Sequence, residues 1–292
     1  DCFIHVIDVS GTTDDSGKPT TENHDPSKDV EFLEKELILW YKNILSKVWK
    51  TFTRKSEQEE LNLSQAIAKQ FSGLKITEDD VKNVLRKLNF NERASSWTED
   101  QIEKFSKALL FQSKPIIIAA NKSDHLHADN NLKKLKEKFP NMKILPCSAD
   151  SELALREATK AELIEYIPGE SHFKTIKTLT EKQQAALKQI KENVLAIYGN
   201  TGVQQILNTT VFDLLKYIAI FPAGANKLQD SKGNILPDCF LLPQGSTALD
   251  FAFYLHTDFG KNFIKAIDAR TKKALGKDYK LKHRDALEIV AK

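Results

Sequence analysis

A short apolar stretch in the middle of the chain ends in residues that could recognise a nucleotide base. Pro115–Ala120 is the apolar stretch, and Asn121, Lys122 and Asp124 lie in the polar turn directly after it. A carboxylate can accept two hydrogen bonds, which matches the N1–H and exocyclic amine of guanine but not the edge of adenine. The aliphatic stem of Lys122 can cover one face of a base, and Asn121 can tie the turn to neighbouring loops.

A second candidate loop follows the next apolar stretch. Cys147 is followed there by Ser148 and Ala149, whose small side chains would let a backbone N–H approach the O6 atom of guanine. Glu152, a few residues on, is better explained as a favourable charge at a helix N-terminus than as a ligand. The alternative for Asn121–Asp124 is a polar turn with no ligand.

The elements around these loops predict a parallel α/β sheet. Lys114–Ala120 is a short continuous apolar run, typical of a strand buried on both faces. The pattern then predicts a helix and a strand at Lys143–Leu145, an alternation typical of parallel sheets. Phe3–Val9 is rich in β-branched residues and predicts another buried strand. Ligands of such sheets bind beyond the carboxyl ends of the strands.

Residues 31–113 predict only helices, so this segment is expected to be an insertion between two strands of the sheet. The first helix follows Asp25-Pro26 and carries an apolar stripe. That stripe comprises Leu33, Leu37, Trp40, Ile44, Val48 and Phe52. Thr77 is expected to cap a later helix, and Thr98 with Gln101 to form a capping box. From Tyr217 onward, short strands, turns and one helix predict a small separate α+β domain.

The bulk composition narrows the possible classes. Lys and Arg number 43 against 40 Asp and Glu, so the net charge of +3 does not by itself argue for nucleic acid. Three widely spaced cysteines disfavour a disulfide framework or a zinc site, and we expect no metal held by protein side chains alone. No apolar run is long enough to cross a bilayer. We therefore expect a cytoplasmic protein with no membrane partner.

The two loops together resemble the fourth and fifth motifs of P-loop GTPases, N-K-x-D and S-A. More closely, the chain resembles the archaeal form of the YchF branch of the Obg family, over nearly its whole length. The matching stretches include Ser148–Arg156, Tyr166–Gly169 and a segment that begins at Gly202. The stretch Gln244–His256 is similar to the signature of TGS domains, which are ubiquitin-like β-grasp modules of translation-linked proteins.

This resemblance implies a partial P-loop NTPase-like sheet with an inserted helical domain and a C-terminal α+β TGS domain. The expected domains are a nucleotide-binding domain at 1–30 and 114–216, a helical arm at 31–113, and a TGS domain at 217–292. Asn121, Lys122, Asp124, Ser148 and Ala149 would bind guanine. The intact family member would hydrolyse GTP with Mg²⁺ and work with the ribosome.

The family's G-x-x-x-x-G-K-[ST] loop does not occur in this sequence. Its catalytic groups are therefore unknown here and are expected upstream of Asp1, and we expect this stretch alone not to hydrolyse GTP. Relatives that carry Glu at the position of Asp124 prefer ATP, whereas this chain has Asp, which favours GTP. ATP preference is one alternative. The other is a non-catalytic RNA or ribosome adaptor with a vestigial nucleotide site.

The adaptor alternative draws on the charge of the C-terminal segment. From Tyr217 to Lys292, Lys and Arg outnumber Asp and Glu by twelve to eight. Lys272, Lys273 and Lys277 lie in a predicted turn between two strands, where their charges should project together into solvent. We expect them to contact structured RNA, without specificity for DNA.

Overall fold

The computed structural model describes residues 1–14, 16–21, 24–58, 62–90, 93–224, 228, 233–235 and 238–292. The chain divides into two compact units, Asp1–Leu207 and Asn208–Lys292. The second unit begins before Tyr217, where the sequence pattern starts its last domain. One reason is that the preceding π-helical segment, Thr209–Leu214, packs the Phe212 ring edge-on against His283, with centroids 4.9 Å apart.

The first unit is built on a three-stranded parallel sheet in the order β1-β2-β3. The strands are β1 (Phe3–Asp8), β2 (Ile116–Asn121) and β3 (Lys143–Pro146). In the register, Asp8 lies beside Asn121 and Ala120 beside Pro146, so all three strands end at one edge. The predicted parallel sheet is confirmed, and its carboxyl edge brings the two candidate loops together.

The predicted burial of the first strand is wrong. Only Ile7 of β1 is buried, whereas Val6 is 59% exposed. Among the described residues β1 pairs with β2 alone and so forms an edge of the sheet. The central strand β2 behaves as predicted, because Ile117, Ile118 and Ala120 are fully buried.

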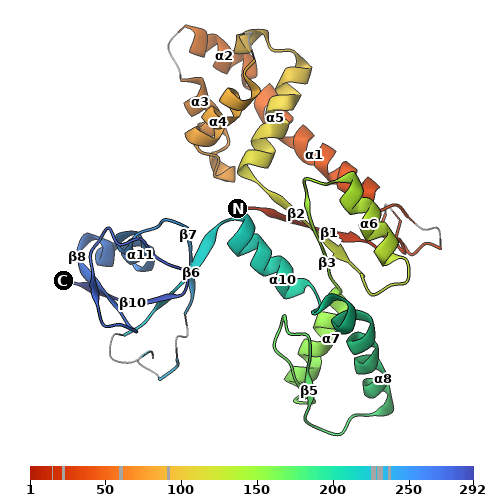
Figure 1. Cartoon of the computed structure of the whole chain (residues 1–292). Helices are drawn as coiled ribbons and strands as arrows, with labels where there is room; N and C mark the ends of the chain where they lie inside the picture. The colour runs from red at the N-terminus through yellow and green to blue at the C-terminus, as the bar shows by residue number, and fades with distance from the viewer. Residues whose placement is uncertain are drawn as a thin grey trace. The chain divides into compact units, whose positions relative to one another are not determined.

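Helices and short strands complete the part of the first unit that contains the sheet. Helix α6 (Ala128–Lys138) packs Leu132 and Leu135 against the sheet. Beyond β3 come α7 (Ala149–Lys160), the hairpin β4–β5 (Ile164–Glu165 and Lys174–Thr175), and α8 (Glu181–Ile190). Helix α8 continues through a π-helical segment, η3 (Lys191–Leu195), into α9 (Ala196–Tyr198); α10 (Val203–Asn208) follows. Figure 1 shows α7 and α8 side by side.

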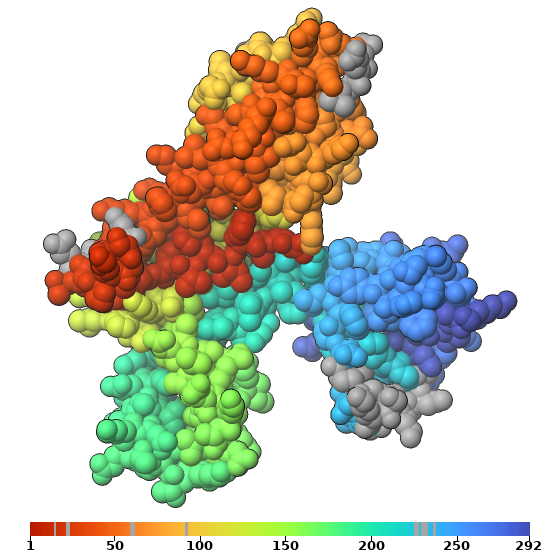
Figure 2. Space-filling view, turned by 180° about the vertical axis from the view of Figure 1, so that it is seen from behind, coloured from red at the N-terminus to blue at the C-terminus, as the bar shows by residue number. Residues whose placement is uncertain are grey.

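The segment between β1 and β2 is helical, as the sequence predicts. It contains α1 (Ser27–Ser46), α2 (Trp49–Glu57), α3 (Leu63–Gln70), η1 (Ser72–Leu74), α4 (Glu78–Leu88), η2 (Ala94–Ser96) and α5 (Glu99–Ser113). Their side chains form one body, orange to yellow in Figure 2. The capping boxes at Thr77 and Thr98 are present.

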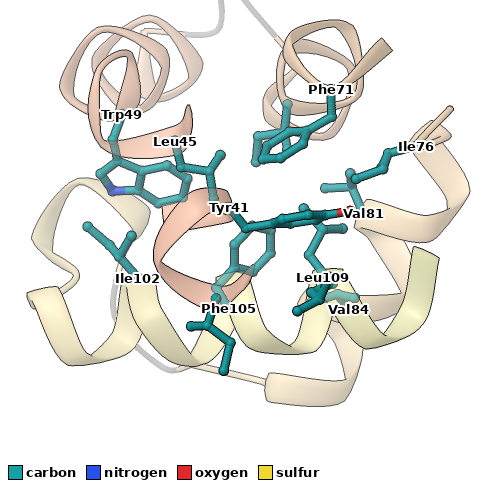
Figure 3. Close-up of a cluster of buried hydrophobic side chains, with 13 residues drawn as sticks. Tyr41, Leu45, Trp49, Phe71, Ile76, Val81, Val84, Ile102, Phe105 and Leu109 are labelled. Atoms are coloured by element: carbon teal, nitrogen blue, oxygen red, sulfur yellow. The ribbon is translucent and has the colours of Figure 1, made fainter. Parts of the chain in front are cut away.

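This helical block has its own core, shown in Figure 3. Tyr41, Phe71 and Phe105 are buried side chains at its centre, and the Tyr41 and Phe71 rings lie 5.2 Å apart. Burial of large aromatic side chains is worth several kcal/mol each, so the block has a core of its own to stabilise it.

The buried face of the first helix differs from the predicted stripe. Val30, Ile38, Tyr41 and Leu45 are the buried apolar residues of α1, whereas Trp40 is 42% exposed. Both the predicted and the observed sets of residues have helical spacing. The packing of α1 against α5 buries the set that lies beside the predicted one. The single long helix expected from the periodicity is two helices, because α1 ends at Ser46 and α2 begins at Trp49.

The second unit is a five-stranded mixed sheet with helices. The order is β7-β6-β10-β8-β9. Its strands are β6 (Tyr217–Pro222), β7 (Phe240–Pro243), β8 (Phe263–Asp268), β9 (Ala274–Leu275) and β10 (Asp285–Ala291), with helices α11 (Ala248–Leu255) and α12 (Thr257–Lys261). The central pair β6–β10 is parallel, and Phe251 of α11 is fully buried in the core. A helix packed on a mixed sheet is the predicted β-grasp arrangement.

Candidate nucleotide-base site

The loops after β2 and β3 are hydrogen-bonded to each other at the carboxyl edge of the sheet. The Ser123 N–H donates to the Cys147 carbonyl (3.1 Å), and the Cys147 N–H donates to the Ala120 carbonyl (2.8 Å). Lys122 adopts a left-handed conformation (φ 61°), which turns the chain sharply after the strand. These backbone bonds make the two loops one structural feature.

Asn121 joins the loops through its side chain, the position that the sequence interpretation gave it. Its Oδ1 atom accepts a hydrogen bond from the Ala149 N–H at 3.0 Å. This bond changes one expectation, because the Ala149 N–H is engaged within the protein. The N–H groups of Asp150 and Ser151 lie in the first turn of α7, where a helix has no backbone partner for them.

Lys122 is fixed by Asp8 at the end of the neighbouring strand. Its Nζ atom lies 2.7 Å from Asp8 Oδ2 and 3.3 Å from Thr12 Oγ1. Burial alone would raise the pKa of Asp8, but hydrogen bonds from Lys122, Ser10 and Thr13 together hold it well below its usual range. The anchored ammonium leaves the Lys122 stem in a defined place beside the loops.

Asp124 opens onto a pocket of about 220 Å³. Within the part of the chain that the structure describes, no hydrogen bond or ion pair engages its half-buried carboxylate. The remaining lining comes from the start of α7, from α8 and from the segment after it: Asp150, Ser151, Ala186, Gln189, Ile190, Asn193 and Val194. Pockets for drug-sized ligands are roughly 300–1,000 Å³, so this one suits a single flat ring system.

Ser148 and Glu152 are buried supports of the second loop. Ser148 Oγ donates to Ser151 Oγ at 2.8 Å, and the Ser148 N–H donates to the Thr201 carbonyl at 2.9 Å. Glu152, 4% exposed, accepts from Tyr166 (2.8 Å), Thr201 (2.6 Å) and Arg156 Nε (2.6 Å). Burial alone would raise the pKa of Glu152, yet these bonds lower it. Glu152 is therefore a buried hydrogen-bonding centre and more than a helix-end charge.

Residues 198–202, which we call the brace, contact both loops and were missed by the sequence interpretation of the site. The Tyr198 hydroxyl lies 3.0 Å from the Ser123 carbonyl and 2.8 Å from Asp129 Oδ1, and burial together with Asp129 raises the pKa of Tyr198 to about 12. Gly202 packs directly on Pro146 and Cys147. The feature of the sequence that could have identified the brace is the stretch from Gly202 onward, which resembles the family.

The three candidate RNA-contact lysines lie in the second unit, at or just beyond the β8–β9 hairpin. Lys272, Lys273 and Lys277 are all exposed. Lys272 has a left-handed backbone (φ 61°), and its Nζ atom donates to the Ala269 carbonyl at 2.7 Å. Its ammonium group is therefore turned back onto the hairpin, whereas the sequence predicted that all three charges project together.

Two further properties concern the described residues as a whole. None of their helices combines the length and apolar character needed to pass through a bilayer. No cluster of three or more His, Cys, Asp or Glu side chains in the described ranges is arranged to hold a metal ion.

Comparison with known proteins agrees with the fold and the loops. Residues 119–224 match the G4 motif-containing domain of YGR210-like, Obg-like GTPases, and residues 222–291 match the TGS domain. The chain is 44% identical over its full length to a GTP-binding protein of Methanocaldococcus jannaschii, of which it covers 73%. It is 32% identical over 85% of its length to a GTP-binding protein of Schizosaccharomyces pombe, and it spans 63% of that relative.

Solved structures give the same result. The crystal structure of a GTP-binding protein from Pyrococcus horikoshii matches 99% of this chain and 78% of its own, with a TM-score of 0.77 and 42% identity. The YchF GTPase of S. pombe shares the fold, with a TM-score of 0.54 at 18% identity. The sheet, its loops and the C-terminal unit define a GTPase-like nucleotide-binding protein that carries a TGS domain. The chain belongs to the YchF-type branch of the Obg family.

Proposed function

We propose that this protein binds guanine nucleotides, with Asp124 reading the base. Its carboxylate accepts hydrogen bonds from N1–H and the 2-amino group, and the stem of Lys122 covers one face of the ring. Asn121 holds the Ser148–Ala149 loop in place, and the first N–H groups of α7 are the donors available to O6.

The observation that carries this proposal is the unengaged carboxylate of Asp124. Asp8, Asp129 and Glu152 lie close by in the same site, and each is occupied by hydrogen bonds from the protein. Asp124 lacks such a partner in the described ranges and lines a pocket at the carboxyl edge of the sheet. A carboxylate held there without a partner fits a ligand with paired N–H donors.

The test exchanges the acceptor for a donor. Asp124→Asn should weaken GDP binding by about 2 kcal/mol, because the guanine donors lose a charged acceptor. The amide N–H can instead donate to the 2-carbonyl of xanthine, so xanthosine diphosphate should bind the variant better than the unmodified protein. Calorimetry of the full-length protein measures both.

Asp150→Asn is the matched control, since Asp150 is the second carboxylate of the same pocket. It should leave the preference for guanine over xanthine unchanged. Equal affinity of the unmodified protein for GDP and ADP would contradict the proposal, and tighter binding of ADP would favour the ATP alternative. A precedent for that alternative is the relative from Buchnera aphidicola, 25% identical, which is named a ribosome-binding ATPase.

We further propose that the full-length protein hydrolyses GTP with Mg²⁺ and acts at the ribosome in the cytoplasm. The support is family membership: relatives and structural neighbours are named GTP-binding proteins, a YchF GTPase and a ribosome-binding ATPase. In P-loop enzymes a glycine-rich loop and its Lys cradle the phosphates, with Mg²⁺ bridging them. The residues described above would contribute base recognition to that reaction.

A second candidate function, an RNA or ribosome adaptor, is favoured by one observation in the second unit. Lys272, Lys273 and Lys277 are exposed within a short stretch at the β8–β9 hairpin. Such charges bind phosphates without reading sequence. The two functions are compatible, because the nucleotide site and these lysines belong to different units.

A further inference from the structure

The wall of the pocket that faces Asp124 comes from α8 and the π-helical segment after it. Ala186, Gln189, Ile190, Asn193 and Val194 line it, at the spacing of one helix face. Ile190 and Val194 are buried and anchor this face. Gln189 and Asn193 are its exposed polar residues, and in the described part of the chain their side-chain amides have no hydrogen-bond partner.

Guanine offers one more donor than Asp124 can accept in a bidentate contact. Its 2-amino group has two hydrogens, and a carboxylate that binds N1–H and one of them leaves the second without a partner. A donor that is removed from water and finds no acceptor incurs the full free-energy cost of its desolvation. Side-chain amides carry a carbonyl oxygen that can accept such a hydrogen. The carboxylate of Asp124 lines the same pocket, so the pocket favours a ligand with N–H donors.

Asn193 is the better placed of the two amides. It lies in the π-helical segment Lys191–Leu195, a conformation frequent at functional sites. Tyr198 follows five residues later, in the short α9 that continues the same helix. The Tyr198 hydroxyl lies 3.0 Å from the carbonyl of Ser123, the residue directly before Asp124. Along the helix, Asn193 is thus nearer than Gln189 to a contact with the Asp124 loop.

We propose that Asn193 is a specificity-determining residue, whose side-chain oxygen accepts the second hydrogen of the guanine 2-amino group. This inference rests on the proposed binding of guanine by Asp124. It makes the helix after the β4–β5 hairpin part of the base site, in addition to the two loops of the sheet.

The test compares GDP with inosine diphosphate, which lacks the 2-amino group. Asn193→Ala in the full-length protein should weaken GDP binding about three- to tenfold, the value of one hydrogen bond. Inosine diphosphate has no hydrogen to offer Asn193, so its affinity should change less than about twofold by the same reasoning. Asn193 is exposed, so the substitution should leave folding intact; thermal melting checks this.

Two control variants on the same helix make the result specific. Gln184 lines a different pocket, formed with Phe173 and Leu179, so Gln184→Ala should alter neither affinity. Gln189→Ala should change the GDP-to-inosine ratio less than Asn193→Ala does. An equal loss for both nucleotides in Asn193→Ala, or a selective loss in Gln189→Ala alone, overturns the assignment of Asn193.

The two experiments distinguish a failure of the role of Asn193 from a failure of the proposed function. If Asp124→Asn abolishes the preference for guanine while Asn193→Ala leaves the GDP-to-inosine ratio unchanged, only the role of Asn193 fails. If Asp124→Asn has no effect on guanine binding, the proposed function itself fails and the role of Asn193 fails with it.

Discussion

Asp8 shows how one carboxylate can hold a loop of the candidate site from a neighbouring strand. It receives hydrogen bonds from the hydroxyls of Ser10 and Thr13 and an ion pair from Lys122, 2.7 Å away. Charge-assisted bonds of this kind are stronger than neutral ones. The ion pair spans β1 and the loop after β2, so it fixes the stem of Lys122 relative to the sheet.

The lowered pKa of Asp8 gives a pH-dependent prediction. A carboxylate whose pKa is lower in the folded than in the unfolded protein adds stability above its unfolded pKa, near 4, and loses it as the pH falls. Asp8→Asn should therefore reduce the free energy of unfolding by about 1–3 kcal/mol at pH 7. The difference from the unmodified protein should shrink below about pH 4. Urea unfolding at several pH values measures this.

A double-variant cycle identifies the partner. With Lys122→Met already present, Asp8→Asn should cost less, because the ion pair is gone. A cost that stays the same at pH 7 and pH 3 would show that the charge of Asp8 contributes nothing to stability.

At the scale of elements, the brace connects the site to the rest of the fold. Tyr198 contacts the loop after β2, while Thr201 and Gly202 contact the loop after β3. The brace ends at α10, whose last residue is where the second unit begins. One short segment therefore supports both loops of the candidate site.

Substitution of two glycines of the brace allows the cost of backbone strain to be measured apart from the cost of steric overlap. Gly199 and Gly202 both have positive φ (77° and 84°). A Cβ at Gly199 meets nothing within 4 Å, whereas one at Gly202 would overlap the Pro146 carbonyl and lie 2.7 Å from Cys147 Cα. Gly199→Ala should cost about 1–2 kcal/mol from the left-handed backbone alone. Gly202→Ala should cost more, by about another 1–3 kcal/mol.

Gly202→Ala should also weaken GDP binding, because the Cys147–Ala149 loop must move to make room. Gly199→Ala should leave GDP binding nearly unchanged. Thermal unfolding and calorimetry of both variants provide the comparison. Similar losses of stability and affinity in the two variants would mean that the packing of Gly202 on Cys147 does not position the loop.

On the scale of the whole molecule, the chain consists of two units with separate cores. Phe251 lies at the centre of the core of the C-terminal unit. In the first unit, the sheet and the helical block each have a core. Side chains that share no partner contribute to stability almost independently. A change in the core of one unit should therefore leave the core of the other unit intact.

Charge reversal tests the adaptor function. Changing Lys272, Lys273 and Lys277 to Glu should weaken RNA or ribosome binding across sequences. The slope of log affinity against log salt concentration should also become less steep, by roughly 0.7–0.9 for each phosphate that the variant fails to neutralise. Lys272 should contribute least when reversed singly, because its Nζ atom donates to the Ala269 carbonyl. GDP affinity should stay the same. Unchanged ribosome co-sedimentation at several salt concentrations would show that these lysines are only a solvated surface.

The sequence by itself determined the elements and the chemistry of the loops. The apolar run before Asn121 predicts a buried strand, and the Thr-based capping boxes set where α4 and α5 begin. These are local signals, since neighbouring residues satisfy them. The local sequence did not determine which face of α1 is buried, because two overlapping apolar stripes both fit a helix. Only the packing of α1 on α5 decides between them.

The tertiary structure alone decided what surrounds the loops. Lys122 and Asp8 are far apart in the sequence, and only the parallel register of β1 and β2 brings their charges to 2.7 Å. Likewise, Asn193 belongs to a helix with no pattern of its own that points to this pocket. It lines the pocket with Asp124 because the chain returns after β5 and packs α8 beside α7, a contact between distant segments that local propensity does not encode.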